Sequence, residues 1–142
     1  MTQRLFTPEE VNRLIPRLTE LLESAMERYR QAVAVQERLR EARARRAEAG
    51  REGGPGEADR STGPALAERL DGLGIELRQA IEEIESLGGV VKDLGMGLVD
   101  FPGRGPGEHR ERVVNLCWRY GESAVEFWHG MDEGFAQRKP LA

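Results

Sequence analysis

Hydrophobic positions in the first third of the chain follow the period of an amphipathic helix. After Pro16 they recur at alternating steps of four and three residues, which is the seam of a coiled coil or a helical hairpin. The seam positions are Leu18, Leu22, Ala25, Tyr29, Ala32, Gln36 and Leu39. Residues 1–49 are therefore predicted to form one long helix, with a polar far end in which arginines and glutamates alternate.

The start of this helix carries both a capping signal and a bend signal. Thr7 can cap a helix, Pro8 suits the first helical position, and Glu10 completes a capping box with Thr7. Pro16 lacks the backbone N–H that a helix interior uses, and its ring crowds the preceding turn. The long helix is therefore expected to be kinked near Ile15.

A second apolar stripe with the helical period follows a segment of different composition. Residues 50–63 are rich in glycine, proline and charge, which favours a flexible connector over packed structure. Residues 64–88 are predicted to form the second helix, which Gly88 can end as a C-cap. Its stripe consists of Leu66, Leu70, Leu73, Leu77, Ile81 and Ile84. Two stripes joined by a flexible connector predict an antiparallel helical hairpin.

The last third of the chain changes its period from about 3.6 to 2. Residues 113–120 give the clearest strand, with Leu116 and Trp118 on one face and Cys117 on the other. Shorter extended runs, bounded by turn residues, are found at 90–92, 97–101 and 124–129. The fold class predicted for the single domain 1–142 is thus α+β. The long antiparallel helical hairpin is followed by a β-rich module, residues 89–142, containing a small antiparallel β-meander of three to four strands.

Composition narrows the classes of function. The formal net charge of −4 over 142 residues gives no overall basic surface, so a nucleic-acid partner is not expected. The arginine-rich stretch from Arg38 to Arg51 is partly balanced by interspersed glutamates and is typical of a solvated helix. The single cysteine can form no intramolecular disulfide, the sequence contains no long apolar run, and we expect no secretory leader. We expect a cytoplasmic protein that does not insert into a membrane.

Several segments together resemble a known family. They are 6–16 (FTPEEVNRLIP), 91–93 (VKD), 97–102 (GLVDFP), 116–122 (LCWRYGE) and 128–135 (WHGMDEGF). The chain resembles the uncharacterised bacterial family catalogued as domain of unknown function 2203. The resemblance implies a small bacterial cytoplasmic protein, and it assigns no activity and no catalytic residue.

The polar residues of the β-rich module include a possible ligand set. A small-ligand or metal-binding enzyme or sensor would use Asp100, Cys117, Glu122 and His129, since thiolate, imidazole and carboxylate suit zinc or iron. Asp132 is a further carboxylate for such a set. The spacing matches no compact metal motif, so no metal, no cofactor and no catalytic residue are assigned. The alternative for Cys117 is a small buried hydrophobe within a strand.

Asp100 and His129 are the residues that strand alternation explains least. Asp100 stands between Val99 and Phe101, and a structural ion pair is favoured over a catalytic acid. The available cations for this pair are Lys92, Arg104 and Arg119. His129 can act as acid, base or ligand, whereas a histidine at a strand end is more often a hydrogen-bonded structural residue.

Two tryptophans complete the ligand-binding candidates. Trp118 and Trp128 could line an aromatic pocket, but core packing is the favoured explanation for both. The favoured function is a non-catalytic interaction protein that self-associates, as a homodimer, through its uncovered helical stripes; another protein partner is the alternative occupant of those stripes. The competing ligand or metal function requires Asp100, Cys117, Glu122 and His129 to converge in the folded chain.

Overall fold

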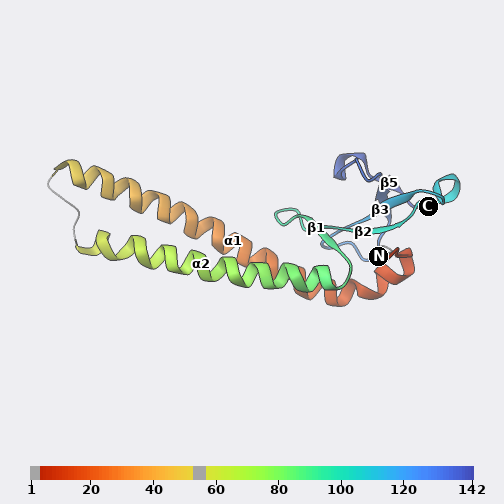
Figure 1. The fold of residues 1–142 in the computed structure, drawn as a ribbon, viewed down its shortest axis with the longest axis horizontal. Helices are drawn as coiled ribbons and strands as arrows, with labels where there is room; N and C mark the ends of the chain where they lie inside the picture. Colours follow the sequence, from red (N-terminus) through yellow and green to blue (C-terminus); the bar gives the residue numbers. More distant parts are fainter. Residues whose placement is uncertain (1–3, 53–56) are drawn as a thin grey trace. The chain divides into compact units, whose positions relative to one another are not determined.

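The computed structural model describes residues 4–52 and 57–142. Two long helices precede a five-stranded antiparallel sheet, so the α+β class and the helical hairpin are confirmed (Figure 1). The described residues divide into two compact units. One unit contains the chain up to Met26 and from Ala80 onward, and the other is Glu27–Gln79. The assignment of the whole chain to a single domain stays a prediction.

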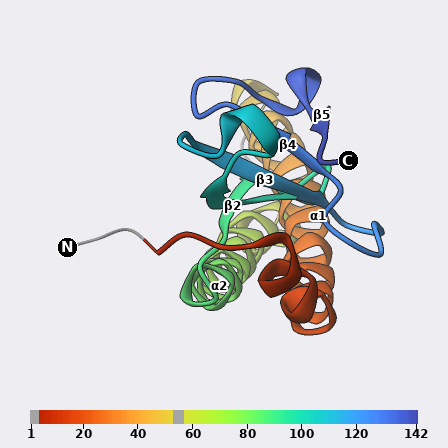
Figure 2. The ribbon, with the colours of Figure 1, turned by 90° about the vertical axis from the view of Figure 1, so that its right-hand side faces the viewer.

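The unit Glu27–Gln79 is the paired part of the hairpin. Helix α1 (Pro8–Glu52) and helix α2 (Glu57–Ser86) lie side by side in both views (Figures 1 and 2). Their seam positions meet in a small apolar cluster, in which Val35, Leu39 and Ala42 of α1 pack with Leu66 and Leu73 of α2. The two stripes of this unit therefore cover each other.

The connector is shorter than the composition of residues 50–63 predicts. Helix α1 runs on to Glu52 and α2 begins at Glu57, so the second helix spans Glu57–Ser86 instead of 64–88. The prediction of a flexible 50–63 segment is wrong for its helical parts, while residues 53–56 lie outside the described chain. The helical parts of the predicted connector, 50–52 and 57–63, contain alanine, glutamate and arginine at half of their positions, and these helix formers continue the two helices through Gly50 and Gly63.

The start of α1 follows its sequence signals. Thr7 and Glu10 form the reciprocal capping box, with N–H to side-chain oxygen distances of 3.0 and 3.1 Å. The helix continues through Pro16, and its opening turns run at an angle to the turns that follow (Figure 1). The loss of one helical hydrogen bond at Pro16 accounts for this bend.

The sheet is an antiparallel meander with the strand order β1-β2-β3-β4-β5. Its strands are β1 (Val90–Asp93), β2 (Leu98–Arg104), β3 (Val113–Arg119), β4 (Phe127–His129) and β5 (Lys139–Pro140). The fifth strand exceeds the predicted three to four, because two residues are too short to show alternation. The last predicted strand, 124–129, begins only at Phe127, since the N–H of Val125 is bonded to Asn12 Oδ1 at 2.7 Å.

The two faces of the sheet are covered by different parts of the chain. Side chains of α1 and α2 pack on the inner face, where Phe101, Leu116 and Trp118 are fully buried. The segment after β4 lies on the other side of the sheet (Figure 2). The outer face of β2, β3 and β4 is thus shielded from water, which allows its polar residues to be buried as well, whereas Val90 and Lys92 of β1 stay exposed.

The N-terminal segment extends the sheet where β1 ends. Phe6 donates its N–H to the carbonyl of Pro102 at 2.7 Å and forms a parallel bridge with Gly103. The Phe6 ring contacts Phe101 edge to face at 5.2 Å and is almost fully buried. Gly88 makes room for this ring, because a Cβ at position 88 would clash with Cζ of Phe6.

No helix in the described ranges 4–52 and 57–142 is long and apolar enough to cross a membrane.

Replacing Gly88 with alanine is expected to destabilise the fold by at least about 1–2 kcal/mol, because position 88 has φ of +105° and no space for a methyl group. Gly72→Ala is the matched control: its site is open and lies inside α2, so the substitution is expected to stabilise by about 1 kcal/mol. Urea unfolding monitored by circular dichroism measures both. Equal effects of the two substitutions would contradict the role assigned to Gly88.

Candidate metal centre

Three consecutive strands place an acid, a thiol and an imidazole on the outer face of the sheet. Asp100 of β2 is the direct cross-strand partner of Cys117 of β3, and His129 of β4 is the partner of Asn115. Because side chains alternate along a strand, residues 115 and 117 share a face, and their partners share it too. The pairing register therefore brings Asp100, Cys117 and His129 together.

The three groups are close enough to share one ion. One ligand atom from each of Asp100, Cys117 and His129 lies within 4.8 Å of the other two. All three residues are buried, with at most 2% of their surface exposed. Charged groups at such depth are retained only when they are paired or coordinate a cation.

The orientation of the His129 ring is fixed by its Nδ1 atom. This nitrogen lies 2.9 Å from the carbonyl oxygen of Gly130. A carbonyl oxygen can only accept, so Nδ1 carries the proton and donates it. In the neutral ring this leaves the lone pair of Nε2 facing the cluster, which is the tautomer that a metal-binding histidine needs.

The carboxylate of Asp100 lacks the donors that a buried acid normally has. His129 Nε2 lies 3.0 Å from Oδ2, which is an ion-pair distance. Neither Asp100 oxygen, however, accepts a hydrogen bond of good geometry from the described residues, and the nearby protonated thiol of Cys117 offers only a weak donor. Two unsatisfied carboxylate oxygens beside an imidazole lone pair are electrostatically unfavourable unless a proton or a cation lies among them.

The thiol of Cys117 is held protonated by its surroundings. Burial, followed by the nearby Asp100 carboxylate, raises the pKa of Cys117 to about 12. The guanidinium of Arg138 opposes this shift from 4.0 Å. Without a cation the thiol is therefore inert at neutral pH, whereas a bound metal ion would replace its proton.

A small pocket opens onto the cluster. It has a volume of about 110 Å³, and its walls include Lys92, Leu98, Glu133 and Phe135 in addition to the three cluster residues. Glu133 is oriented by Lys139 at 2.7 Å and by the N–H of Gly130 at 2.7 Å. The pocket gives a small molecule or a water access to the cluster.

The structure separates the other sequence candidates from this cluster. Glu122 makes two hydrogen bonds with Arg138, at 2.9 and 3.2 Å, and lies outside the group of three. Trp118 is buried in the core and donates its indole N–H to the carbonyl of Glu122 at 2.9 Å. Trp128 also belongs to the core, and Asp132 is exposed.

The partner of Asp100 differs from the predicted cations. Within the part of the chain that the structure describes, Lys92, Arg104 and Arg119 form no ion pair with Asp100, whose nearest charged or titratable partner is His129. Arg119 instead reaches the carbonyl of Met96 at 3.4 Å, and Arg104 that of Arg110 at 3.4 Å. The strand register decides this choice, because Asp100 and His129 flank the same segment of β3.

Sequence reasoning did not single out two residues beside the cluster. Asn115 is buried at 6% exposure directly opposite His129, and Arg138 closes over Cys117 from beyond β4. Alternation of side chains along β3 places Asn115 on the same face as Cys117, so the sequence pattern is sufficient to predict its position beside the cluster. Arg138 follows an irregular segment, and no pattern in the sequence predicts where its side chain lies.

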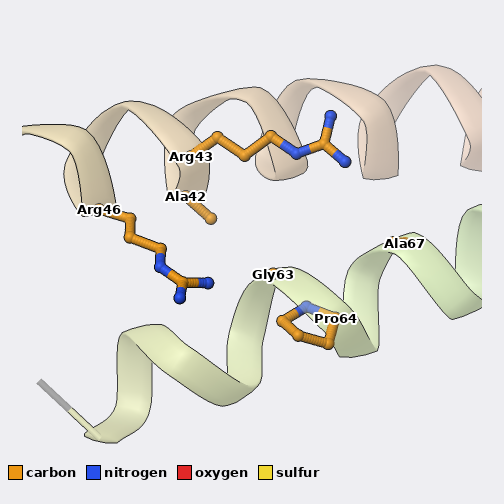
Figure 3. A pocket seen from close by; sticks show the side chains of 6 residues that line it. All are labelled: Ala42, Arg43, Arg46, Gly63, Pro64 and Ala67. Carbon is orange, nitrogen blue, oxygen red and sulfur yellow. The ribbon is translucent and has the colours of Figure 1, made fainter. Parts of the chain in front are cut away.

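A second pocket, within the paired part of the hairpin, lacks comparable chemistry. It has a volume of about 210 Å³ and lies between α1 and α2 near Ala42, Gly63 and Pro64 (Figure 3). Arg46 points from α1 toward α2, and Arg43 points along α1 (Figure 3). The described residues that line this pocket include no acid, thiol or imidazole, so it offers no metal-binding group.

The fold and the cluster define an α+β protein in which one sheet face buries an acid, a thiol and an imidazole. Residues 4–141 match the family described as "Uncharacterized conserved protein (DUF2203)", and the chain belongs to this family. The family prediction is thereby confirmed. No curated protein and no solved structure matches the chain.

Asp100 is either a buried carboxylate without adequate donors or one half of a structural ion pair with His129. The variant Asp100→Asn distinguishes these two interpretations. In the metal-free protein we expect this variant to be more stable by about 1 kcal/mol or more, because it removes a buried charge without adequate donors. A structural ion pair with His129 predicts the reverse, a loss of about 3–5 kcal/mol. Urea unfolding in the presence of a chelator measures the sign.

Proposed function

We propose that this protein binds a divalent transition-metal ion, zinc foremost, through Asp100, Cys117 and His129. The observation that carries the proposal is the cluster itself: three buried ligand-type groups lie within 4.8 Å of one another, and neither carboxylate oxygen accepts a hydrogen bond of good geometry from a described residue. A divalent cation would satisfy the carboxylate, the imidazole lone pair and the thiolate together.

The geometry is compatible with tetrahedral coordination. Zinc–ligand bonds of about 2.0–2.3 Å place neighbouring ligand atoms about 3.5 Å apart. The observed separations reach at most 4.8 Å, and that between Asp100 Oδ2 and His129 Nε2 is 3.0 Å. Side-chain adjustments of about 1 Å, well within rotamer freedom, would complete the site.

The charges around the cluster also support a divalent ion. One carboxylate and one thiolate balance the two charges of the ion, and Arg138 is already neutralised by Glu122. The Gly130 carbonyl that holds His129 Nδ1 is the outer-shell partner that metal-binding histidines commonly have. The site would thus be close to electrically neutral when loaded.

Three protein ligands leave a fourth position for an exchangeable group. In zinc proteins this arrangement is typical of reactive sites, in which the ion lowers the pKa of a bound water to about 7. The pocket of about 110 Å³ supplies the space for that group. We therefore place the protein with the ligand- or metal-dependent proteins. The cytoplasmic location stays a prediction and suits a thiolate ligand that must remain reduced.

Zinc titration of the chelator-treated protein tests the proposal. We expect one ion per chain, and we expect Cys117→Ser and His129→Gln each to weaken binding by more than about 100-fold in a competition assay with a chromophoric chelator. His109→Gln is the matched control, because His109 lies in the loop after β2 and pairs with the exposed Glu108 at 3.4 Å. This variant is expected to bind zinc as the parent does.

Cobalt substitution gives an independent readout. A thiolate-bound cobalt ion absorbs in the near ultraviolet by charge transfer, and this band is expected in the parent and the His109→Gln control but not in Cys117→Ser. Stoichiometric zinc binding that survives loss of Cys117 and His129 would contradict the assignment. Failure of the folded parent protein to bind zinc or cobalt would overturn it.

Self-association through the helices is a second candidate function. The stripes on which the prediction rests are largely covered within the chain. Among the described residues of the paired hairpin, the large apolar side chains of Tyr29, Val33 and Ile75 nevertheless remain exposed, at 38%, 50% and 55%. Tyr29 and Val33 are four residues apart and share one face of α1, which supports a helix-mediated homodimer.

Light scattering after size exclusion tests this second candidate. A homodimer at micromolar concentration is expected, and Val33→Glu is expected to convert it to a monomer because the charge would be desolvated at the contact. Arg30→Glu, on an exposed position of the same helix, is the control for added negative charge. A monomeric parent protein at these concentrations would rule the homodimer out.

A further inference from the structure

A third pocket, distinct from the one between α1 and α2, adjoins the metal cluster on the outer face of the sheet. It has a volume of about 290 Å³, close to the lower end for small-molecule sites, and Lys92 lines both this pocket and the pocket at the cluster. Val90 and Lys92 of β1 and Asn115 of β3 contribute to its walls. Asn115 is the cross-strand partner of His129, so its side chain is a direct neighbour of a cluster residue.

The amide of Asn115 is the unusual feature of this pocket. Its residue is 94% buried, at 6% relative exposure, and its side chain makes no hydrogen bond to any residue in the described ranges. The amide atoms themselves are not among the fully buried unpartnered groups, so they reach water in the pocket, and a ligand there can take the place of that water. The pocket is the space into which a hydrogen-bonding partner for this amide can enter.

The charged residues that line the pocket indicate the charge of a ligand that would bond to Asn115. Lys92 is exposed and forms no ion pair with a described residue, and Arg4 adds a second cation, although Glu10 engages it at 3.2 Å. The described lining residues include no acid. An anionic group would therefore gain a charge-assisted contact with Lys92 and a hydrogen bond from the Asn115 amide.

The remaining walls are apolar. Phe6, Val90 and Met131 line the pocket. Val90 and Met131 have 47% and 55% of their surfaces exposed. Exposed apolar side chains next to an unpaired lysine and an unpartnered amide favour a ligand with a charged head and a hydrocarbon body. Phosphate recognition usually employs several arginines, whereas this pocket offers one unpaired lysine, one amide and an Arg4 already paired with Glu10, a set that suits a carboxylate better.

We propose that this pocket binds a small organic carboxylate, with its head at Lys92 and Asn115 and its apolar body against Phe6, Val90 and Met131. The ligand would lie beside the open position of the metal cluster. Its binding does not require the metal, because none of these contacts involves Asp100, Cys117 or His129.

Nuclear magnetic resonance of the ¹⁵N-labelled chain tests this proposal with hexanoate as the probe. We expect hexanoate to shift the side-chain amide signal of Asn115, at constant ionic strength, in both the chelator-treated and the zinc-treated protein. Hexanol and hexylamine are matched in length and carry no negative charge, so they are expected to leave this signal unchanged. Inorganic phosphate carries the charge without the apolar body and is expected to bind more weakly.

Two variants locate the contacts. Lys92→Gln, at an exposed position, is expected to weaken hexanoate binding about tenfold. Asn115→Asp keeps the side-chain shape and places a negative charge opposite the carboxylate, so binding monitored on neighbouring backbone amides is expected to be lost. Arg13→Gln removes a positive charge from an exposed position of α1 outside the pocket and is expected to bind hexanoate as the parent does.

The outcomes separate this proposal from the metal proposal. Hexanoate binding without any zinc binding keeps the carboxylate pocket and removes the metal site. Zinc binding without an Asn115 shift by hexanoate overturns the carboxylate pocket alone. A response to hexanol equal to that for hexanoate, a tighter response to phosphate, or an unchanged affinity in Lys92→Gln also overturns it.

Discussion

The pairing of β3 with its two neighbours is the constraint on which the candidate centre depends. Asp100 faces Cys117 across one side of β3, and His129 faces Asn115 across the other. The same register sends Phe101, Leu116 and Trp128 to the inner face, where they form the core with α1 and α2. Packing of the inner face therefore fixes the outer face as well, because successive side chains of a strand point to opposite sides.

The segment after β4 covers part of the outer face of the sheet and so buries the polar groups there. This segment supplies Glu133, Phe135 and Arg138, which surround the cluster and carry their own pairs with Lys139 and Glu122. Its order depends on side-chain hydrogen bonds and cation–π contacts, such as Arg138 stacked 3.9 Å from the Phe127 ring centroid. A protein that needed only stability would gain by placing apolar residues at positions 100 and 129. Retention of unsatisfied polarity at that depth is typical of functional sites.

Periodicity predicted the fold from the sequence more completely than it predicted the site. The helical seam from Leu18 to Leu39 and the alternation along β3 gave the class, the hairpin and most of the meander. Alternation also set Cys117 apart from Trp118. The partner of Asp100 could not be found in this way, because pairing across strands depends on register, and no short spacing links positions 100, 117 and 129. The length of the connector does not follow from composition, because composition alone does not weigh Gly50 and Gly63 against the helix formers beside them.

Because the three groups come from three successive strands, the site forms only when all three strands pair in the correct register. Slippage of any one strand by a single residue would turn its ligand toward the helices and replace it with an apolar side chain. The hairpin loops between the strands, by contrast, can change in length without moving Asp100, Cys117 or His129, since the ladders alone hold them in place. An ion held by Asp100, Cys117 and His129 would thus bind only the sheet with the correct register. Its binding would stabilise that register relative to misaligned conformations.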